Sequence, residues 1–206
     1  MLGIVAYALG AMYSPGPVNL LGLNIGINGQ ARQSVGFCLG VGTAMLAYLL
    51  VLGWAGAAWI DDEALIVVSA LGCGYIVYLA SKIARSSVDI SEPDNAPRLV
   101  SYRDGLVMQL LNPKAILATL PIATLQFPAA DIHGLSLVFW AFGLAMLAAG
   151  APGSYIVIGS AVGSRIKSPA IVKGFNWLMA ALLVAVALSI GVEHVWVPLT
   201  PQSQGL

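Results

Sequence analysis

Long apolar stretches separated by short polar segments run along the whole chain. Six of these stretches reach the length of about 20 residues that a helix needs to cross a bilayer. They cover residues 2–27, 35–58, 64–83, 105–127, 135–162 and 174–195. The pattern predicts an all-α polytopic membrane protein with six transmembrane helices.

The longest polar stretch divides these segments into two sets of three. It runs over residues 85–103 and combines mixed charge with proline, serine and asparagine, which are typical of a solvated linker. We therefore expect a single membrane domain over residues 1–206. Its parts are a first half (1–84), a cytoplasmic linker (85–103), a second half (104–196) and a short outer tail (197–206).

The basic residues favour alternate loops. Cytoplasmic loops of membrane proteins are enriched in Lys and Arg. All the basic residues except Lys114 lie in or directly around the loops after the first, third and fifth segments. This distribution predicts that both termini lie outside. Because each half has three spans, the halves would have opposite orientations, as two inverted three-helix repeats.

Composition supports the bilayer as the surroundings. Hydrophobic residues make up 59% of the 206 residues and charged residues only 9%, against roughly 25% charged in soluble domains. Net charge is zero and no basic patch carries aromatic residues, which excludes a nucleic-acid partner. No metal-ligand spacing and no catalytic motif occur, so we expect neither a metal, a cofactor nor an enzyme activity.

Two proline breaks interrupt the first and fourth apolar segments. They are residues 14–19 (Ser-Pro-Gly-Pro-Val-Asn) and 111–115 (Leu-Asn-Pro-Lys-Ala). One proline in a membrane helix usually produces only a kink, but paired interruptions in two halves mark the binding site of many transporters. The helix after a break presents free N–H groups that suit a carboxylate, and carbonyls freed by proline suit an ammonium group. The breaks therefore predict a site for a zwitterion.

Lys114 lies within the fourth segment, beside the second break. It is about 10 residues into the span, roughly 15 Å along a helix, which is a long way to snorkel to the headgroups. An interior role is favoured, in contact with a substrate carboxylate or a freed carbonyl. The predicted substrate-binding residues are Pro15, Gly16, Pro17, Asn19, Gln109, Asn112, Pro113 and Lys114.

Both breaks resemble signature motifs of the lysine exporter (LysE/RhtB) family of amino-acid translocators. Its Pro-Gly-Pro-x-Asn motif is matched by Pro15, Gly16, Pro17 and Asn19, and its Asn-Pro-Lys-Ala motif by Asn112, Pro113, Lys114 and Ala115. The resemblance implies a secondary transporter in the bacterial inner membrane. It would export small amino acids or related metabolites from the cytoplasm by alternating access, driven by the proton gradient.

The chain departs from that family at two positions where many members carry a membrane-buried acid. Thr43 follows Gly42 in the second segment, and residues 147–152 of the fifth contain no Asp. Buried carboxylates usually relay protons or neutralise cations. The coupling ion therefore stays open, and a neutral or zwitterionic amino acid is a better substrate than a cationic one.

Two other functions are open. An intramembrane thiol redox carrier would use Cys38 and Cys73, although apolar surroundings disfavour reactive thiolates. A non-transporting membrane scaffold would leave the breaks without a purpose. Gly-x-x-x-Gly spacings at 22–26, 36–40 and 159–163 allow close helix approach. We expect them to pack helices within the chain, and a homodimer is left open.

Overall fold

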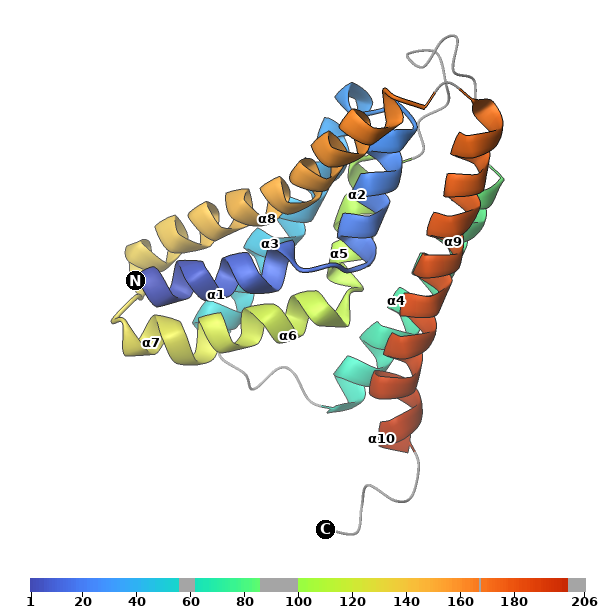
Figure 1. Cartoon of the computed structure of the whole chain (residues 1–206). Helices are drawn as coiled ribbons and strands as arrows, with labels where there is room; N and C mark the ends of the chain where they lie inside the picture. Colours follow the sequence, from blue (N-terminus) through green and yellow to red (C-terminus); the bar gives the residue numbers. More distant parts are fainter. Residues whose placement is uncertain (56–61, 86–99, 167, 200–206) are drawn as a thin grey trace.

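The computed structural model describes residues 1–55, 62–85, 100–166 and 168–199, and these contain helices and no strand (Figure 1). The helices of the first half are α1 (Leu2–Tyr13), α2 (Pro17–Ile27), α3 (Val35–Ala55) and α4 (Asp62–Ala84). Those of the second half are α5 (Tyr102–Leu110), α6 (Pro113–Pro121), α7 (Phe127–Ala129), α8 (Gly134–Gly163), α9 (Pro169–Gly191) and α10 (Val197–Leu199). Short turns complete them: η1 (Arg32–Ser34) and the π-helical turns η3 (Ile122–Gln126) and η4 (Val192–Trp196).

The predicted linker and tail lie largely outside the described residues, which omit 86–99 and 200–206. At the end of the linker, helix α5 begins earlier than the sequence pattern suggested. Ser101 caps it: the Ser101 backbone N–H donates to Asp104 Oδ2 at 2.7 Å, and the Asp104 N–H donates to Ser101 Oγ at 3.4 Å. This reciprocal capping satisfies two backbone donors of the first turn. The division of the chain into two halves stays a prediction.

Four helices are long and apolar enough to cross a membrane without interruption. They cover Arg32–Ala55, Ile66–Ala84, Gly134–Gly163 and Ala170–Trp196. The bent pair Tyr102–Leu110 and Pro113–Ala129, with an angle of 66° at the break, supplies a fifth span if it is counted as one. The first apolar segment forms two helices of 12 and 11 residues, each shorter than a bilayer. Uninterrupted spans therefore number four among the described residues, because proline divides the other two segments.

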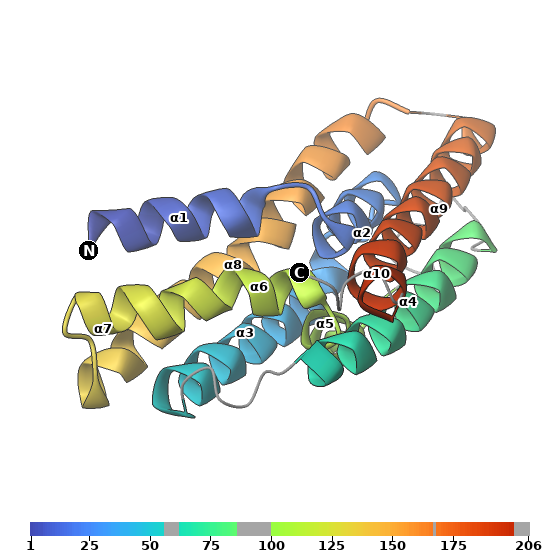
Figure 2. The ribbon, with the colours of Figure 1, turned by 90° about the horizontal axis from the view of Figure 1, so that it is seen from below.

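Helices from the two halves pack in reciprocal pairs. Helix α2 packs along α8, α3 along α5, and α4 along α9 (Figures 1 and 2). The first apolar segment of the sequence thus contacts the fifth, the second contacts the fourth, and the third contacts the sixth. Helices α1 and α6 run in opposite directions beside each other, as both views show.

Glycines allow the backbones of these pairs to touch. A Cβ atom at Gly26 would overlap the carbonyl oxygen of Ile156, and one at Gly159 would overlap that of Leu23. The α3–α5 pair uses Gly40 in the same way against Tyr102. Small residues are what permit such close helix contact in membranes. The prediction that the Gly-x-x-x-Gly spacings pack helices within the chain is confirmed.

Two apolar clusters hold the helices together. One joins α2 and α3 to the α4–α9 pair, with Leu21, Phe37 and Leu183 fully buried. The other joins α1, α3, η3 and α8 around Leu49 and Ile122. The start of α1 and the end of α6 point away from α9, so the α1–α6 pair and α9 diverge at an angle (Figure 1).

Replacement of Gly159 by alanine tests the α2–α8 contact. The added methyl group meets the α2 backbone, so we expect Gly159→Ala to lower the free energy of unfolding by about 1–3 kcal/mol. Thermal unfolding of the purified protein in detergent measures this. Gly153→Ala on the same helix is the matched control, since nothing lies within 4 Å of its Cβ position. Equal melting temperatures for the two variants would contradict the proposed packing.

Candidate functional site

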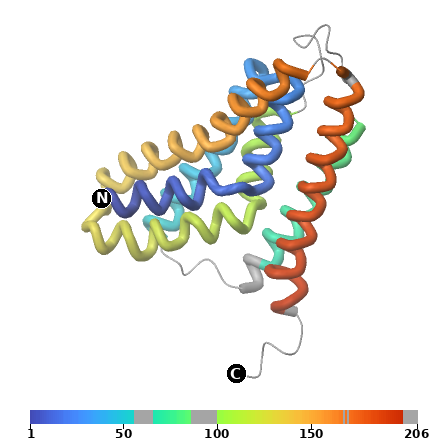
Figure 3. The backbone as a smooth tube through the Cα atoms, in the orientation of Figure 1, coloured from blue at the N-terminus to red at the C-terminus, as the bar shows by residue number. Residues whose placement is uncertain are grey.

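Lys114 joins the two helix breaks. Its Nζ donates hydrogen bonds to the carbonyl oxygens of Ser14 at 3.0 Å and Pro15 at 3.1 Å. Figure 3 shows the chain bending at both breaks, where α1 turns into α2 and α5 into α6. Segments about 100 positions apart in the sequence are therefore in direct contact. These two carbonyls lie at the first break but are not the ones that proline frees, so this contact differs from the freed carbonyl that we predicted for Lys114. Contact with a substrate carboxylate stays a prediction.

The carbonyls that proline frees from the helices are already paired. This differs from our expectation that they would be open to an ammonium group, and it follows the rule that buried backbone groups find partners. The Ala11 oxygen accepts from Ser14 Oγ at 2.8 Å, the Tyr13 oxygen from Tyr155 Oη at 3.0 Å, and the Gln109 oxygen from the Asn112 N–H at 3.2 Å. Leu110, at the end of α5, accepts from the hydroxyl of Tyr48.

One asparagine stabilises each break. Asn19 is buried, and its Nδ2 donates to the Met12 carbonyl at 2.9 Å and to the Ser14 carbonyl at 3.0 Å, across the first break. Asn112 caps α6, where its Oδ1 accepts from the Lys114 N–H at 3.1 Å. The other amide atom of each asparagine, Asn19 Oδ1 and Asn112 Nδ2, takes no part in these backbone contacts.

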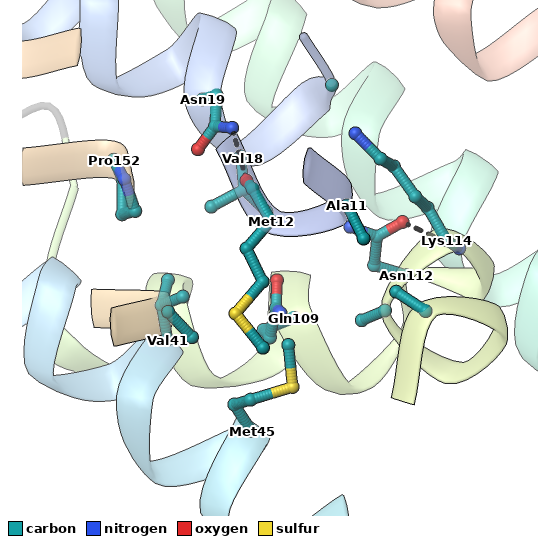
Figure 4. Close-up of a pocket in the computed structure, with 14 residues that line it drawn as sticks. Ala11, Met12, Val18, Asn19, Val41, Met45, Gln109, Asn112, Lys114 and Pro152 are labelled. Atoms are coloured by element: carbon teal, nitrogen blue, oxygen red, sulfur yellow. Dashed lines mark hydrogen bonds between the residues drawn. The ribbon is translucent and has the colours of Figure 1, made fainter. Parts of the chain in front are cut away.

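A small cavity of about 40 Å³ lies between the breaks. Figure 4 shows Asn19 and Met12 on one side of it and Gln109, Asn112 and Met45 on the other. Its lining also includes Ala11, Gly16, Val18, Val41, Lys114, Ala115, Ala118, Ala148 and Pro152. This space holds about three water molecules, and it is too small for an amino acid as it stands.

A larger cleft of about 550 Å³ opens on the other side of Lys114. It lies between the α1–α2 and α5–α6 breaks and the final part of α9 with η4. It is lined by Tyr7, Ala11, Pro15, Gly16, Pro17, Leu20, Pro113, Lys114, Leu117, Ala118, Val186, Ser189, Ile190, Glu193 and His194. Pockets of this size hold small organic ligands. Ala11, Gly16, Lys114 and Ala118 line both spaces, so these residues lie between the small cavity and the cleft.

The eight residues predicted from the sequence line one or both of these spaces. The small cavity is lined by Gly16, Asn19, Gln109, Asn112 and Lys114. The cleft is lined by Pro15, Gly16, Pro17, Pro113 and Lys114.

Sequence reasoning missed the polar residues of α9 and η4 that face the cleft. Ser189, Glu193 and His194 come from the end of the last apolar segment, where polar residues ordinarily mark the membrane boundary. No spacing in the sequence connects this end to the breaks. The missed apolar residues, such as Met12 and Met45, resemble any other residue of a membrane helix.

Three asparagines connect α2 to α9 away from the cleft. Asn176 Oδ1 accepts from Asn24 Nδ2 at 2.8 Å and from Asn28 Nδ2 at 2.7 Å, and Asn176 Nδ2 donates to Asn28 Oδ1 at 3.0 Å. Asn24 and Asn176 are fully buried. Amide hydrogen bonds of this kind hold membrane helices together, and here they fix one end of α9.

The two cysteines lie apart from this site. Cys38 is on α3 and Cys73 is on α4, neither forms a disulfide, and neither lines the small cavity or the cleft. Cys73 Sγ donates to the Ala187 carbonyl at 3.1 Å. Among the described residues, no three His, Cys, Asp or Glu side chains could hold a metal ion together. Nothing in this arrangement favours the redox alternative.

Comparison with known proteins identifies the family. The family model described as LysE type translocator matches residues 9–194. The chain belongs to this family. The resemblance found in the two break motifs is therefore confirmed, and this is a family of membrane transporters. Together with the apolar helices, it supports an integral protein of the bacterial inner membrane.

Several bacterial proteins named cysteine/O-acetylserine efflux protein are similar to this chain. The one from Klebsiella pneumoniae subsp. pneumoniae is 25% identical over 194 residues, which cover 92% of this chain and 95% of that protein. Those from Escherichia coli K12 and Shigella flexneri serotype 5b are 30% identical over 146 residues, covering 69% of this chain and 71% of each relative. No solved structure matches the chain.

Removal of the Lys114 ammonium tests the contact between the breaks. Lys114→Met keeps most of the side-chain volume and removes both hydrogen bonds to the first break. Hydrogen bonds to charged groups contribute about 1.5–3 kcal/mol, so we expect a loss of stability of that order. Thermal unfolding in detergent measures it, with Lys173→Met on the exposed side of α9 as the control. Unfolding curves that coincide for both variants would exclude a structural role for Lys114.

Proposed function

We propose that this protein exports small zwitterionic amino acids or related metabolites from the cytoplasm as a secondary transporter. The observation that carries the proposal is the contact of Lys114 with the first helix break beside a cleft of about 550 Å³. Family membership and relatives named for cysteine and O-acetylserine efflux support it. Both of those compounds are small amino acids with one carboxylate and one ammonium group.

The proposed carboxylate site is formed by Lys114 and the N-terminal ends of α2 and α6. An ammonium group has three N–H donors, and the first break occupies two of those of Lys114. The third is available to a substrate carboxylate in the cleft. The N-terminal ends of α2 and α6 add the positive ends of two helix dipoles. The predicted free N–H groups are not found at α6, where Pro113 has none and those of Lys114 and Ala115 donate to Asn112. Asn19 Oδ1 and Asn112 Nδ2 supply further polar contacts when the small cavity enlarges.

We infer six spans in two inverted repeats, with both termini outside. In this arrangement α1 with α2 forms the first span and α5 with α6 the fourth, each broken near the middle. The reciprocal pairing of helices between the halves supports the repeats, as does the antiparallel course of α1 and α6. The concentration of basic residues in alternate loops supports the orientation.

Alternating access follows from the same features. The three asparagines close the space between α2 and α9 at one end, while the cleft opens at the other. In the proposed cycle, one three-span half rocks against the other around the paired breaks, and the closed end opens as the cleft closes. The freed backbone of the breaks then always faces protein or water, as a bilayer requires.

Transport by the purified protein tests the proposed function. Proteoliposomes loaded with labelled L-cysteine or O-acetyl-L-serine are expected to release label faster than protein-free vesicles. Lys114→Ala is expected to reduce the rate at least tenfold, because the substrate carboxylate loses a charge-assisted hydrogen bond and the breaks lose their contact.

Lys173→Ala is the control for charge, since this exposed residue lines neither the cavity nor the cleft. Efflux from Lys114→Ala equal to that of the control would remove Lys114 from the site. Parallel measurements in cells, with and without a protonophore, determine whether the proton gradient drives transport.

Cross-linking tests the opening of the asparagine contact. In a Cys38→Ser, Cys73→Ser background, cysteines in place of Asn28 and Asn176 can be joined by a short bis-thiosulfonate reagent. We expect the background variant to transport normally, the joined protein to stop, and reductant to restore transport. The two single-cysteine variants, treated identically, are the controls. Continued transport by the joined protein would contradict alternating access at this end, and inactivity of the background variant would favour the thiol redox alternative.

A further inference from the structure

We propose that Glu193 binds the ammonium group of the transported amino acid, opposite the Lys114 pole of the same cleft. This inference rests on the proposed function and names a specificity residue for it. Glu193 belongs to η4, which continues α9, and its side chain is exposed. Glu193 and Lys114 both line the cleft of about 550 Å³, from different sides.

The carboxylate of Glu193 is held in place by its own helix. Ser189, four residues earlier, donates its hydroxyl to Glu193 Oε1 at 3.3 Å and also lines the cleft. Residues four apart lie on the same face of a helix, so this bond keeps the carboxylate on the cleft side. The hydroxyl leaves the other carboxylate oxygen open to an additional donor.

The two opposite charges of the cleft do not neutralise each other. Lys114 donates to backbone carbonyls, and the single ion pair among the described residues joins His133 to Asp131 elsewhere. A lysine and a glutamate that line one space without pairing provide two separate poles. An amino acid carries the complement of both poles on the two groups bonded to its α-carbon. Charge-assisted hydrogen bonds from its ammonium to Glu193 and to its carboxylate from Lys114 would orient it.

The rest of the lining restricts the substrate class. Besides Lys114 and Glu193, the ionisable side chains in the cleft are Tyr7 and His194. Glu193 is thus the single carboxylate among the described residues that line the cleft, so a dicationic amino acid would leave one ammonium group without an anionic partner, which is costly in surroundings of low polarity. Apolar residues such as Leu20, Leu117 and Ile190 cover the remaining surface. The cleft therefore suits amino acids with one ammonium group.

Two isomers separate this role from general effects on transport. O-acetyl-L-serine has a free ammonium group, whereas N-acetyl-L-serine has the same atoms and carboxylate with the amine blocked. Their competition against labelled L-cysteine is measured in proteoliposomes, at mildly acidic pH to prevent acyl migration. For the wild-type protein we expect O-acetyl-L-serine to compete at least tenfold better.

Glu193→Gln keeps the size of the side chain and removes its charge. We expect it to weaken competition by O-acetyl-L-serine about tenfold, to leave N-acetyl-L-serine unchanged, and so to abolish the discrimination. The KM for L-cysteine should rise with little change in kcat. Glu193→Asp should retain part of the discrimination, and Ser189→Ala should weaken it two- to threefold. Asp131→Asn, a carboxylate outside the cleft, is the matched control.

The outcomes distinguish this inference from the proposed function. A wild-type protein that transports L-cysteine, together with a Glu193→Gln variant that still discriminates between the isomers, would overturn the role of Glu193 alone. Equal loss for both isomers would also overturn it, since that indicates a structural effect. A wild-type protein that transports no amino acid would overturn the proposed function and this inference with it. Gel filtration and thermal unfolding of each variant confirm that the compared proteins are folded.

Discussion

The ammonium group of Lys114 and the carbonyls of Ser14 and Pro15 form the contact on which the site depends. Each proline break leaves backbone groups that a bilayer cannot satisfy. Asn19 and Asn112 each hydrogen-bond backbone groups at their own break, and Lys114 bonds backbone groups of the first break from the second. A lone cation in such surroundings is costly, and the backbone oxygens of the first break offset that cost. Two features that would each be unfavourable alone thus stabilise one another.

The close contact between helix backbones fixes where the breaks lie. Gly26 and Gly159 bring α2 against α8, and Gly40 brings α5 against α3. Helix α5, before the second break, and helix α2, after the first break, are therefore anchored to the continuous helices α3 and α8. The α4–α9 pair is attached differently, through a mainly apolar cluster and the amide contacts of Asn176.

The missing acids of the second and fifth segments change the chemistry expected of the site. Among the described residues that line the cleft beside the breaks, the carboxylate comes from η4, where Glu193 lies. A site with its cation on α6 and its anion on η4 spans the two packing units of the molecule. In the proposed function, a zwitterion in the cleft would contact both sides. The relatives named for cysteine and O-acetylserine efflux act on substrates of this charge type.

The sequence by itself determined the membrane class, the approximate helix limits and the positions of the breaks. Hydrophobic length dictates a span, and the missing N–H of Pro15, Pro17 and Pro113 dictates an interruption, so both follow from local chemistry. It also indicated an interior role for Lys114, because the distance to the headgroups depends only on helix rise.

Only the tertiary structure decided which groups meet. The Tyr155 hydroxyl donates to the Tyr13 carbonyl on α1, and Asn176 accepts from Asn24 on α2. Glu193 lines the same cleft as Lys114. The first two contacts join residues more than 140 positions apart in the chain. The residue type of these side chains does not reveal whether they face lipid, protein or water. The pairing of helices determines that choice, and pairing depends on packing of the whole chain rather than on any local pattern.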